Sequence, residues 1–199
     1  MTRTPENRPV SGQKSRTDRI REIRSKGRPE LTFERVRQLL DYDPYNGIFR
    51  HRISRGGKKA GTVAGTACSG YNALFIDCFQ YRSGRIAWLL MTGKPVPAGK
   101  LIDHKNGQRN DDRWENLRLA TPAENARNRG FCKRNTSGKV GVHRIKSGNK
   151  WGADIGLDGR NIHLGRFDTL DEAIAARCKA ERVHYGEFVR PMTEASANG

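Results

Sequence analysis

The sequence predicts an α+β protein made of two small units in tandem. Residues 101–129 combine a polar hairpin pattern with a helix start, and residues 138–190 combine three short strand patterns with another helix start. A basic stretch at 131–137 separates them. A length of 199 residues suits one large domain or two small ones. From the two helix starts and the basic stretch, we expect a first unit over 31–130, a linker over 131–137, a second unit over 138–190 and a tail over 191–199.

The composition favours a polyanionic partner in a reducing compartment. The chain has 38 Lys and Arg against 21 Asp and Glu, a formal net charge of +17. No segment is apolar enough to span or lie in a bilayer, which favours nucleic acid over a membrane. The N-terminus has no apolar signal region, so we expect a cytoplasmic protein. The four cysteines lack zinc-pair spacing and are expected to be free thiols, three of them buried or partly buried.

The region before the hairpin begins with a basic arm. Residues 1–30 have almost no large apolar side chain, which predicts a mobile arm that either contacts phosphates or is simply solvated. A helix is expected from Thr32 to about Tyr42. A single strand is expected over 71–81, followed by a short helix over 83–91.

Residues 101–129, LIDHKNGQRNDDRWENLRLATPAENARNR, have a well-marked helix start after the hairpin. Thr121 is a good N-cap, Pro122 suits the first helical position, and Glu124 completes a capping box. The helix is therefore expected to begin at about residue 122, after a short strand over 117–119.

This arrangement brings three polar groups together. Asp103 and His104 precede the polar turn, and Asn125 lies at the start of the second turn of the helix, facing the hairpin if that face packs inward. A carboxylate, an imidazole and an amide would then converge on one point. Such a group can hold a hard cation through oxygen and leave the histidine free to take a proton from water.

The same stretch resembles the HNH motif of phage and intron-encoded homing endonucleases, the ββα-metal nucleases. The Asp103-His104 pair, Asn116 in ENLR and Asn125 stand at the motif positions. The resemblance implies that Asp103 and Asn125 bind one Mg²⁺ or Mn²⁺ per active site. It also implies that His104 is the general base, that Asn116 braces the loop, and that hydrolysis leaves 5′-phosphate and 3′-hydroxyl ends.

The upstream region departs from that family at one position. Such proteins often have a His-Arg pair before the apolar helix, and this chain has Gly84-Arg85. If that histidine supports the active site or contacts the DNA backbone, this chain lacks the contribution, so whether the protein is fully active stays open. A plainer reading of the hairpin also stays open, in which its Asp and Asn residues only form turns.

Cations follow the motif helix. Arg127, Arg129 and Lys133 are candidates for contact with DNA phosphates near the scissile bond. Alternatively, they are a solvated helix end, where the helix dipole favours positive charge.

The second unit has its own hairpin and helix signals. Strands are expected over 140–142, 151–157 and 160–167, and the turn Asp158-Gly159 is typical of a hairpin. Thr169 and Glu172 form a second capping box, which starts a helix that runs to about His184.

Residues 137–188 resemble the plant ethylene-response-factor (APETALA-type) DNA-binding domain, a three-stranded antiparallel sheet packed on one helix. In that family the sheet lies in the major groove of double-stranded DNA. Trp151 could instead belong to the core, and His143 stands where the family usually has an arginine. The residues carried over as candidate DNA contacts are Arg144, Lys146, Lys150, Trp151, Arg160 and Arg166.

Together these observations predict a metal-dependent, homing-type DNA endonuclease that the C-terminal sheet positions on DNA. With one active site per chain, we expect a monomer that nicks, acting as a phage protein in its bacterial host cell. One alternative is a non-catalytic DNA-binding regulator with a degenerate nuclease fold, and another is RNA binding by the same basic surfaces.

Overall fold

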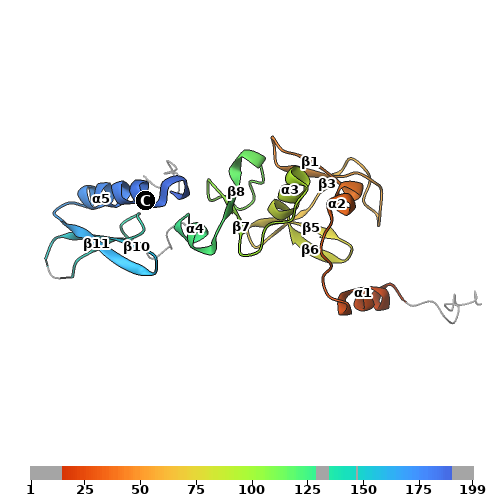
Figure 1. The fold of residues 1–199 in the computed structure, drawn as a ribbon, viewed down its shortest axis with the longest axis horizontal. Coiled ribbons are helices and arrows are strands. Elements are labelled where there is room, and N and C mark those ends of the chain that lie inside the picture. Colours follow the sequence, from red (N-terminus) through yellow and green to blue (C-terminus); the bar gives the residue numbers. More distant parts are fainter. Residues whose placement is uncertain (1–14, 129–134, 147, 190–199) are drawn as a thin grey trace, which may run out of the picture.

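The computed structural model describes residues 15–128, 135–146 and 148–189. Figure 1 shows an elongated molecule with one body at each end and helix α4 (Pro122–Arg127) between them. The described residues form several small antiparallel sheets with helices packed against them, which confirms the α+β class.

The first described segment is helical. Helix α1 (Arg16–Ser25) begins after Ser15, whose side chain accepts a hydrogen bond from the Asp18 amide. The composition of residues 1–30 predicts a mobile basic arm and does not by itself indicate this helix. Local capping and helix-forming residues suffice for a short helix even where most described side chains are exposed. Residues 1–14 lie outside the description.

A first sheet follows helix α2 (Phe33–Leu39), which is capped by Thr32 as expected. The sheet consists of β1 (Leu40–Asp43), β2 (Ile48–His51) and β3 (Val63–Ala64). The helix ends at Leu39 rather than near Tyr42, because Leu40 is extended, buried and paired with His51. Here strand pairing overrides the helical spacing of the sequence.

A second sheet contains β4 (Thr66–Cys68), β5 (Tyr71–Ile76) and β6 (Phe79–Arg82). The single strand expected over 71–81 is in fact a hairpin. Asp77 and Cys78 form its turn with positive φ angles of 46° and 71°, a conformation that the alternating apolar pattern does not reveal. Helix α3 (Ser83–Thr92) follows directly and ends at Gly93.

The core of this larger unit lies between α2, α3 and the two sheets. Its most deeply buried side chains include Val36, Leu74, Ile76 and Ile86. Of the described cysteines, Cys78 and Cys178 are partly buried and Cys68 is exposed. Cys132 lies outside the described residues.

The motif region forms a hairpin, a loop and a helix. Strand β7 (Leu101–His104) pairs with β8 (Leu117–Ala120), and the 3₁₀ helix η1 (Trp114–Asn116) closes the loop between them. Helix α4 starts at Pro122 with the full capping box, as predicted.

The C-terminal body contains the sheet β11-β10-β9, formed by β9 (Val142–Arg144), β10 (Trp151–Leu157) and β11 (Arg160–Phe167). Strand β9 begins two residues later than expected. Helix α5 (Leu170–Tyr185) contacts all three strands and is followed by the 3₁₀ helix η2 (Gly186–Phe188).

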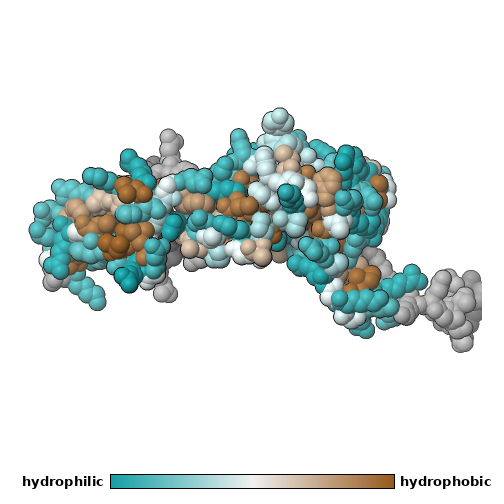
Figure 2. All heavy atoms as spheres, in the orientation of Figure 1, coloured by the Kyte–Doolittle hydropathy of each residue, from teal (hydrophilic) through white to brown (hydrophobic). Residues whose placement is uncertain are grey.

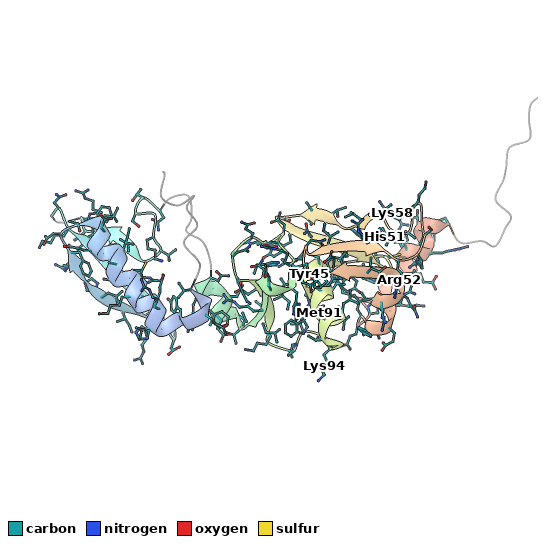
Figure 3. The ribbon with its side chains drawn as sticks, turned by 90° about the horizontal axis from the view of Figure 1, so that it is seen from above. Tyr45, His51, Arg52, Lys58, Met91 and Lys94 are labelled. Carbon is teal, nitrogen blue, oxygen red and sulfur yellow. The ribbon has the colours of Figure 1, made fainter. Side chains whose placement is uncertain are left out.

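The end of the C-terminal body touches the motif hairpin. The Arg118 guanidinium donates a hydrogen bond to the Glu187 carbonyl and lies 4.2 Å from the centre of the Phe188 ring. Arg127 of α4 lies 5.0 Å from the centre of the Tyr185 ring. Figure 3 shows, from above, the same arrangement of two bodies meeting at α4, with Tyr45, Met91 and Lys94 on the larger one.

The surface is strongly hydrophilic. In Figure 2, hydrophilic residues cover most of the visible face, and hydrophobic residues form separate small patches on the two bodies. Among the described residues, no helix has the length and apolar character needed to cross a membrane.

Candidate active site

The β7–β8 hairpin positions the Asp103-His104 pair. Asp103 is paired with Arg118, and His104 with Leu117. Both side chains are buried, with 5% and 6% of their surface exposed. Because successive strand residues point to opposite sides, the carboxylate and the imidazole meet different partners.

Asp103 accepts hydrogen bonds from two neighbouring side chains. The Arg118 Nε atom lies 2.8 Å from Oδ2, and the Asn128 Nδ2 atom lies 2.9 Å from Oδ1. Asn128 Nδ2 also donates to the His104 carbonyl at 2.6 Å. The buried carboxylate is therefore paired and hydrogen-bonded, as a buried charge must be to remain ionised at low cost. The sequence analysis missed both partners, although each lies within the motif stretch.

His104 forms its side-chain hydrogen bond on the other side of the strand. Its Nε2 atom lies 3.1 Å from Oδ1 of Asp112, a carboxylate in the loop between β7 and β8. The Tyr71 ring lies nearby, with 6.2 Å between ring centres.

Asn116 ties the two ends of this loop together. Its Oδ1 accepts the Asn106 amide at 3.0 Å, and its Nδ2 donates to the Asp111 carbonyl at 2.7 Å. Asp111 in turn accepts hydrogen bonds from Arg113, which lowers the pKa of Asp111 to about 2. The geometry is that of a loop brace, the role that the resemblance gives to Asn116.

A cleft of about 1370 Å³ is lined by residues of β5, β6, α3 and β7, together with Asn125 of α4. Asp103, His104, Asn125 and Asn128 contribute to its lining. The structure therefore brings the expected carboxylate, imidazole and amide to one cavity. Asn116 is not among the residues that line it.

The cleft also contains arginines that the sequence analysis did not select. Arg82 and Arg109 stack on the Tyr71 ring, at 3.9 Å and 5.2 Å from its centre, and Arg85 lies beside them in the lining. The two stacking residues come from opposite ends of the region, β6 and the motif loop, so no local pattern links them. Cations in fixed positions beside a carboxylate–histidine pair suit a phosphate backbone.

The oxygen atoms in the cleft fit a hard divalent cation. Asp103 carries a carboxylate and Asn125 an amide group, and both residues line the same cavity. Asn128 Oδ1 is buried and has no hydrogen-bond partner among the described residues, so it is an acceptor without a donor. The described part of the chain has no group of three or more His, Cys, Asp or Glu that could hold a metal. One carboxylate with amide oxygens and water suits magnesium better than zinc.

The residues expected to contact phosphates after the motif helix are only partly described. Arg127 lies over the Tyr185 ring, so its guanidinium packs against the C-terminal body. Arg129 and Lys133 lie outside the described residues.

The candidates on the C-terminal sheet do not share one face. Arg144 lies 5.7 Å from the centre of the Trp151 ring, and Trp151 packs against the core cluster under α5. Arg160 pairs with Leu157 on that same helix-side face, whereas Arg166 pairs with Gly152 on the open face. Lys146 is exposed at the β9–β10 turn, and Lys150 is paired with Asp168 at 3.0 Å.

The open face of this sheet carries two histidines around one carboxylate. Asp154 lies 2.8 Å from Nδ1 of His163 and 3.5 Å from Nδ1 of His143. His143 also packs over Gly152, where an added Cβ would lie 2.7 Å from its Nε2. The face on which each of these residues lies follows from strand alternation and from the pairing register, and the sequence alone does not give that register.

Comparisons with known proteins agree with the motif. The sequence profile of a family described as HNH endonuclease matches residues 83–127, which include α3, the hairpin and α4. An uncharacterized HNH endonuclease of Acanthamoeba polyphaga mimivirus is 28% identical over 123 residues, which are 62% of this chain and 63% of that protein. No solved structure matches the chain.

A phage protein is more similar. Protein 3.8 of Escherichia phage T7 is 36% identical over 96 residues, which are 48% of this chain and 78% of that protein. The chain therefore belongs to the family of phage T7 protein 3.8 and contains an HNH endonuclease domain.

Proposed function

We propose that this protein is a metal-dependent DNA endonuclease that hydrolyses phosphodiester bonds in the cleft lined by α3, β7 and Asn125 of α4. The observation that carries the proposal is the convergence of Asp103, His104 and Asn125 on one cavity lined by arginines. The match to the HNH endonuclease family over the same residues supports it. The substrate is double-stranded DNA, and the product ends are a 5′-phosphate and a 3′-hydroxyl.

His104 acts as the general base of the reaction. Its Nε2 atom is engaged by Asp112, and none of the hydrogen bonds found among the described residues uses Nδ1. The Nδ1 lone pair can therefore accept the proton of an attacking water at the cleft. Asn116 stabilises the conformation of the loop through its hydrogen bonds to Asn106 and Asp111.

Asp103 and Asn125 hold one Mg²⁺ or Mn²⁺, and the unpartnered Oδ1 of Asn128 is a third candidate oxygen. When bound, the cation supplies charge neutralisation at the scissile phosphate and the leaving 3′ oxygen. Arg118 is the cation that already neutralises Asp103 Oδ2, so Oδ1 is the oxygen better placed for a metal.

Arg82, Arg85 and Arg109 hold the DNA backbone beside the reacting phosphate, with Tyr71 fixing two of the guanidinium groups by stacking. The C-terminal sheet, as in an ethylene-response-factor-type domain, directs the nuclease to its site. A homing-type enzyme that acts as a monomer with one such cleft nicks one strand at each encounter.

The test is plasmid cleavage. The purified full chain is incubated with supercoiled plasmid, with magnesium or manganese, and with excess chelator as a control. We expect open-circular product that requires the metal and disappears in His104→Ala. Cutting that persists in chelator would refute the metal role, and absence of cutting with either metal would refute the endonuclease.

A second candidate is a non-catalytic DNA-binding regulator. One observation favours it: both carboxylate oxygens of Asp103 already accept hydrogen bonds, from Arg118 and Asn128. If the protein binds DNA with nanomolar affinity but does not bind magnesium in calorimetry, this candidate replaces the first.

A further inference from the structure

Asp112 is a buried carboxylate in the motif loop to which the sequence analysis assigns no role. Its side chain is 1% exposed. Its Oδ1 lies 3.1 Å from His104 Nε2, and its Oδ2 lies 2.5 Å from Ser83 Oγ and 3.0 Å from Asn72 Nδ2. These partners come from three different elements, β7, α3 and β5, which shows that the fold converges on this carboxylate.

The backbone of Asp112 is fixed as firmly as its side chain. Its carbonyl accepts the Tyr42 hydroxyl at 2.6 Å. The β1–β2 turn packs directly on the same peptide: at Gly47, where φ is 74°, an added Cβ would lie 2.6 Å from the Arg113 nitrogen. Because both the backbone and the side chain of Asp112 are fixed by contacts, its carboxylate stays in one position. It can therefore impose one orientation on the His104 ring.

The contact also imposes one tautomer. A carboxylate oxygen that faces an imidazole nitrogen accepts a hydrogen bond, so His104 Nε2 must carry the proton. In the neutral ring Nδ1 is then the nitrogen with a free lone pair. That lone pair is what a general base requires.

Gly84 is part of the same arrangement. An added Cβ there would lie 3.4 Å from Asp112 Oδ1 and 3.2 Å from Ile102 Cγ2. Any side chain at this position, at the start of α3, would therefore press on Ile102 and touch the Asp112 carboxylate. The position that differs from the usual His-Arg pair thus adjoins the Asp112–His104 contact.

We propose that Asp112 is the positioning residue of His104. It fixes the imidazole in the Nε2–H tautomer and directs Nδ1 to the cleft for proton transfer. This inference rests on the proposed function, because a base can be positioned only for a reaction that occurs.

Asp112→Asn separates positioning from a purely structural role. The amide oxygen can face Ser83 and Asn72, and the amide nitrogen can then donate to His104 Nε2. All three contacts survive, so a structural tether would be nearly unaffected. The direction of the histidine hydrogen bond, however, is reversed, and Nδ1 would carry the proton and lose its function as a base.

The experiment has two arms on the full chain. In the first, long-range ¹H–¹⁵N correlation spectra of ¹⁵N-histidine-labelled protein identify the His104 tautomer, with His104→Gln used to assign the signal and no DNA or metal added. In the second, plasmid nicking rates are measured with magnesium. Asp77→Asn serves as the matched control, because Asp77 is a partly buried carboxylate paired with Arg35 and Arg55 on a different hairpin.

We expect the Nε2–H tautomer in the parent and the Nδ1–H tautomer in Asp112→Asn. The nicking rate of Asp112→Asn should fall by about 10²–10⁴, the range for loss of a general base. Asp77→Asn should stay within a few-fold of the parent. Unchanged DNA affinity in Asp112→Asn would support the assignment to the chemical step.

The outcomes are distinguishable. If the parent nicks and Asp112→Asn nicks within about three-fold of it, or if the tautomer does not change, positioning by Asp112 is refuted while the endonuclease stands. If the parent shows the Nε2–H tautomer but does not nick with magnesium or manganese, the proposed function is refuted and the inference with it. Should Asp112→Asn fail to fold, Asp112→Glu takes its place. If the Asp112→Glu protein has the Nε2–H tautomer and nicks plasmid, the inference is supported. If it has that tautomer but does not nick, the inference is refuted.

Discussion

At the scale of single residues, the site consists of two buried carboxylates on either side of one strand. Asp103 meets Arg118 and Asn128, and Asp112 meets His104. Each carboxylate has its own donors, so removing a member of either pair leaves a buried polar group without its partner. Loss of activity and loss of stability are therefore expected together, and each has to be measured separately.

Substitution of Asp103 should separate these two effects. Asp103→Ala leaves the buried Arg118 guanidinium without its carboxylate, which should reduce the free energy of unfolding by about 3–5 kcal/mol. Asp103→Asn keeps an acceptor and should cost less, yet should still abolish magnesium-dependent nicking. Urea titrations, calorimetry with magnesium and plasmid assays measure the three quantities. Magnesium-dependent nicking at the parental rate in Asp103→Asn would exclude this carboxylate as a ligand.

Substitution of His104 should affect both stability and rate. His104→Ala removes a donor from the buried Asp112 carboxylate, so unfolding should become easier by about 1–3 kcal/mol. Nicking should fall by about 10²–10⁴. His184→Ala, an exposed histidine on α5, is the matched control and should behave as the parent in both measurements. A His104→Ala protein that nicks within a few-fold of the parent would show that another group is the base.

At the scale of elements, the motif loop depends on an ion pair that responds to pH. The hydrogen bonds of Arg113 lower the pKa of Asp111 from its ordinary 3.8 to about 2. A lowered pKa in the folded state stabilises the fold above about pH 4, and this contribution is lost as the pH falls from about 4 through 2.

Asp111→Asn should therefore reduce the free energy of unfolding by at most about 1–2 kcal/mol at pH 7. Solvent screens the pair because Arg113 is partly exposed, which keeps the effect small. The difference from the parent should shrink as the pH is lowered from 5 to 3. Urea titrations at several pH values measure it. A difference that stays constant over this range would mean that the carboxylate charge does not stabilise the loop.

The cleft arginines form a second element-scale feature, built from β6 and the motif loop around Tyr71. If Arg82 contacts one phosphate, Arg82→Ala should weaken binding to all DNA sequences alike and reduce the salt slope by about one unit. Arg52→Ala provides the control, because Arg52 pairs with Asp41 near the first sheet and does not line the cleft. The measurement is a binding titration at several salt concentrations. If the salt slope of binding is the same for both variants and the parent, Arg82 does not contact a DNA phosphate.

At the scale of the whole molecule, the two bodies are coupled through the active-site hairpin. Arg118 bonds to Asp103 on one side and contacts Glu187 and Phe188 of the C-terminal body on the other. The C-terminal body is thus in direct contact with a residue that holds the expected metal ligand. Deleting 138–199 would remove these contacts together with the whole C-terminal sheet.

The two faces of the C-terminal sheet give a prediction about specificity in the intact protein. Arg166 lies on the open face and Arg160 on the face shared with α5. If the open face contacts bases, Arg166→Ala should cost about 1–3 kcal/mol on a preferred site and little on random DNA. Arg160→Ala is the matched control and should retain the preference, and titrations on both DNAs distinguish the variants. Loss of preference in Arg160→Ala alone would assign DNA contact to the opposite face.

The sequence by itself determined the local features of this protein. The capping boxes at Thr121 and Thr169, the turn at Asp158-Gly159 and the helix after β6 follow from short-range chemistry, so each was found where expected. The motif likewise fixes the spacing of the Asp103-His104 pair and Asn125 along the chain, and all three line the cleft, while their roles stay a prediction. Net charge is likewise independent of the fold.

Only the tertiary structure decided which side chains surround that pair. Strand pairing ended α2 early at Leu40 and divided the strand expected over 71–81 into a hairpin. The same long-range packing brought Asp112 to His104, Ser83 and Asn72 to Asp112, and Arg118 and Asn128 to Asp103. These partners are set by register, strand alternation and contacts between distant elements, and such contacts leave no periodic signal in a single sequence.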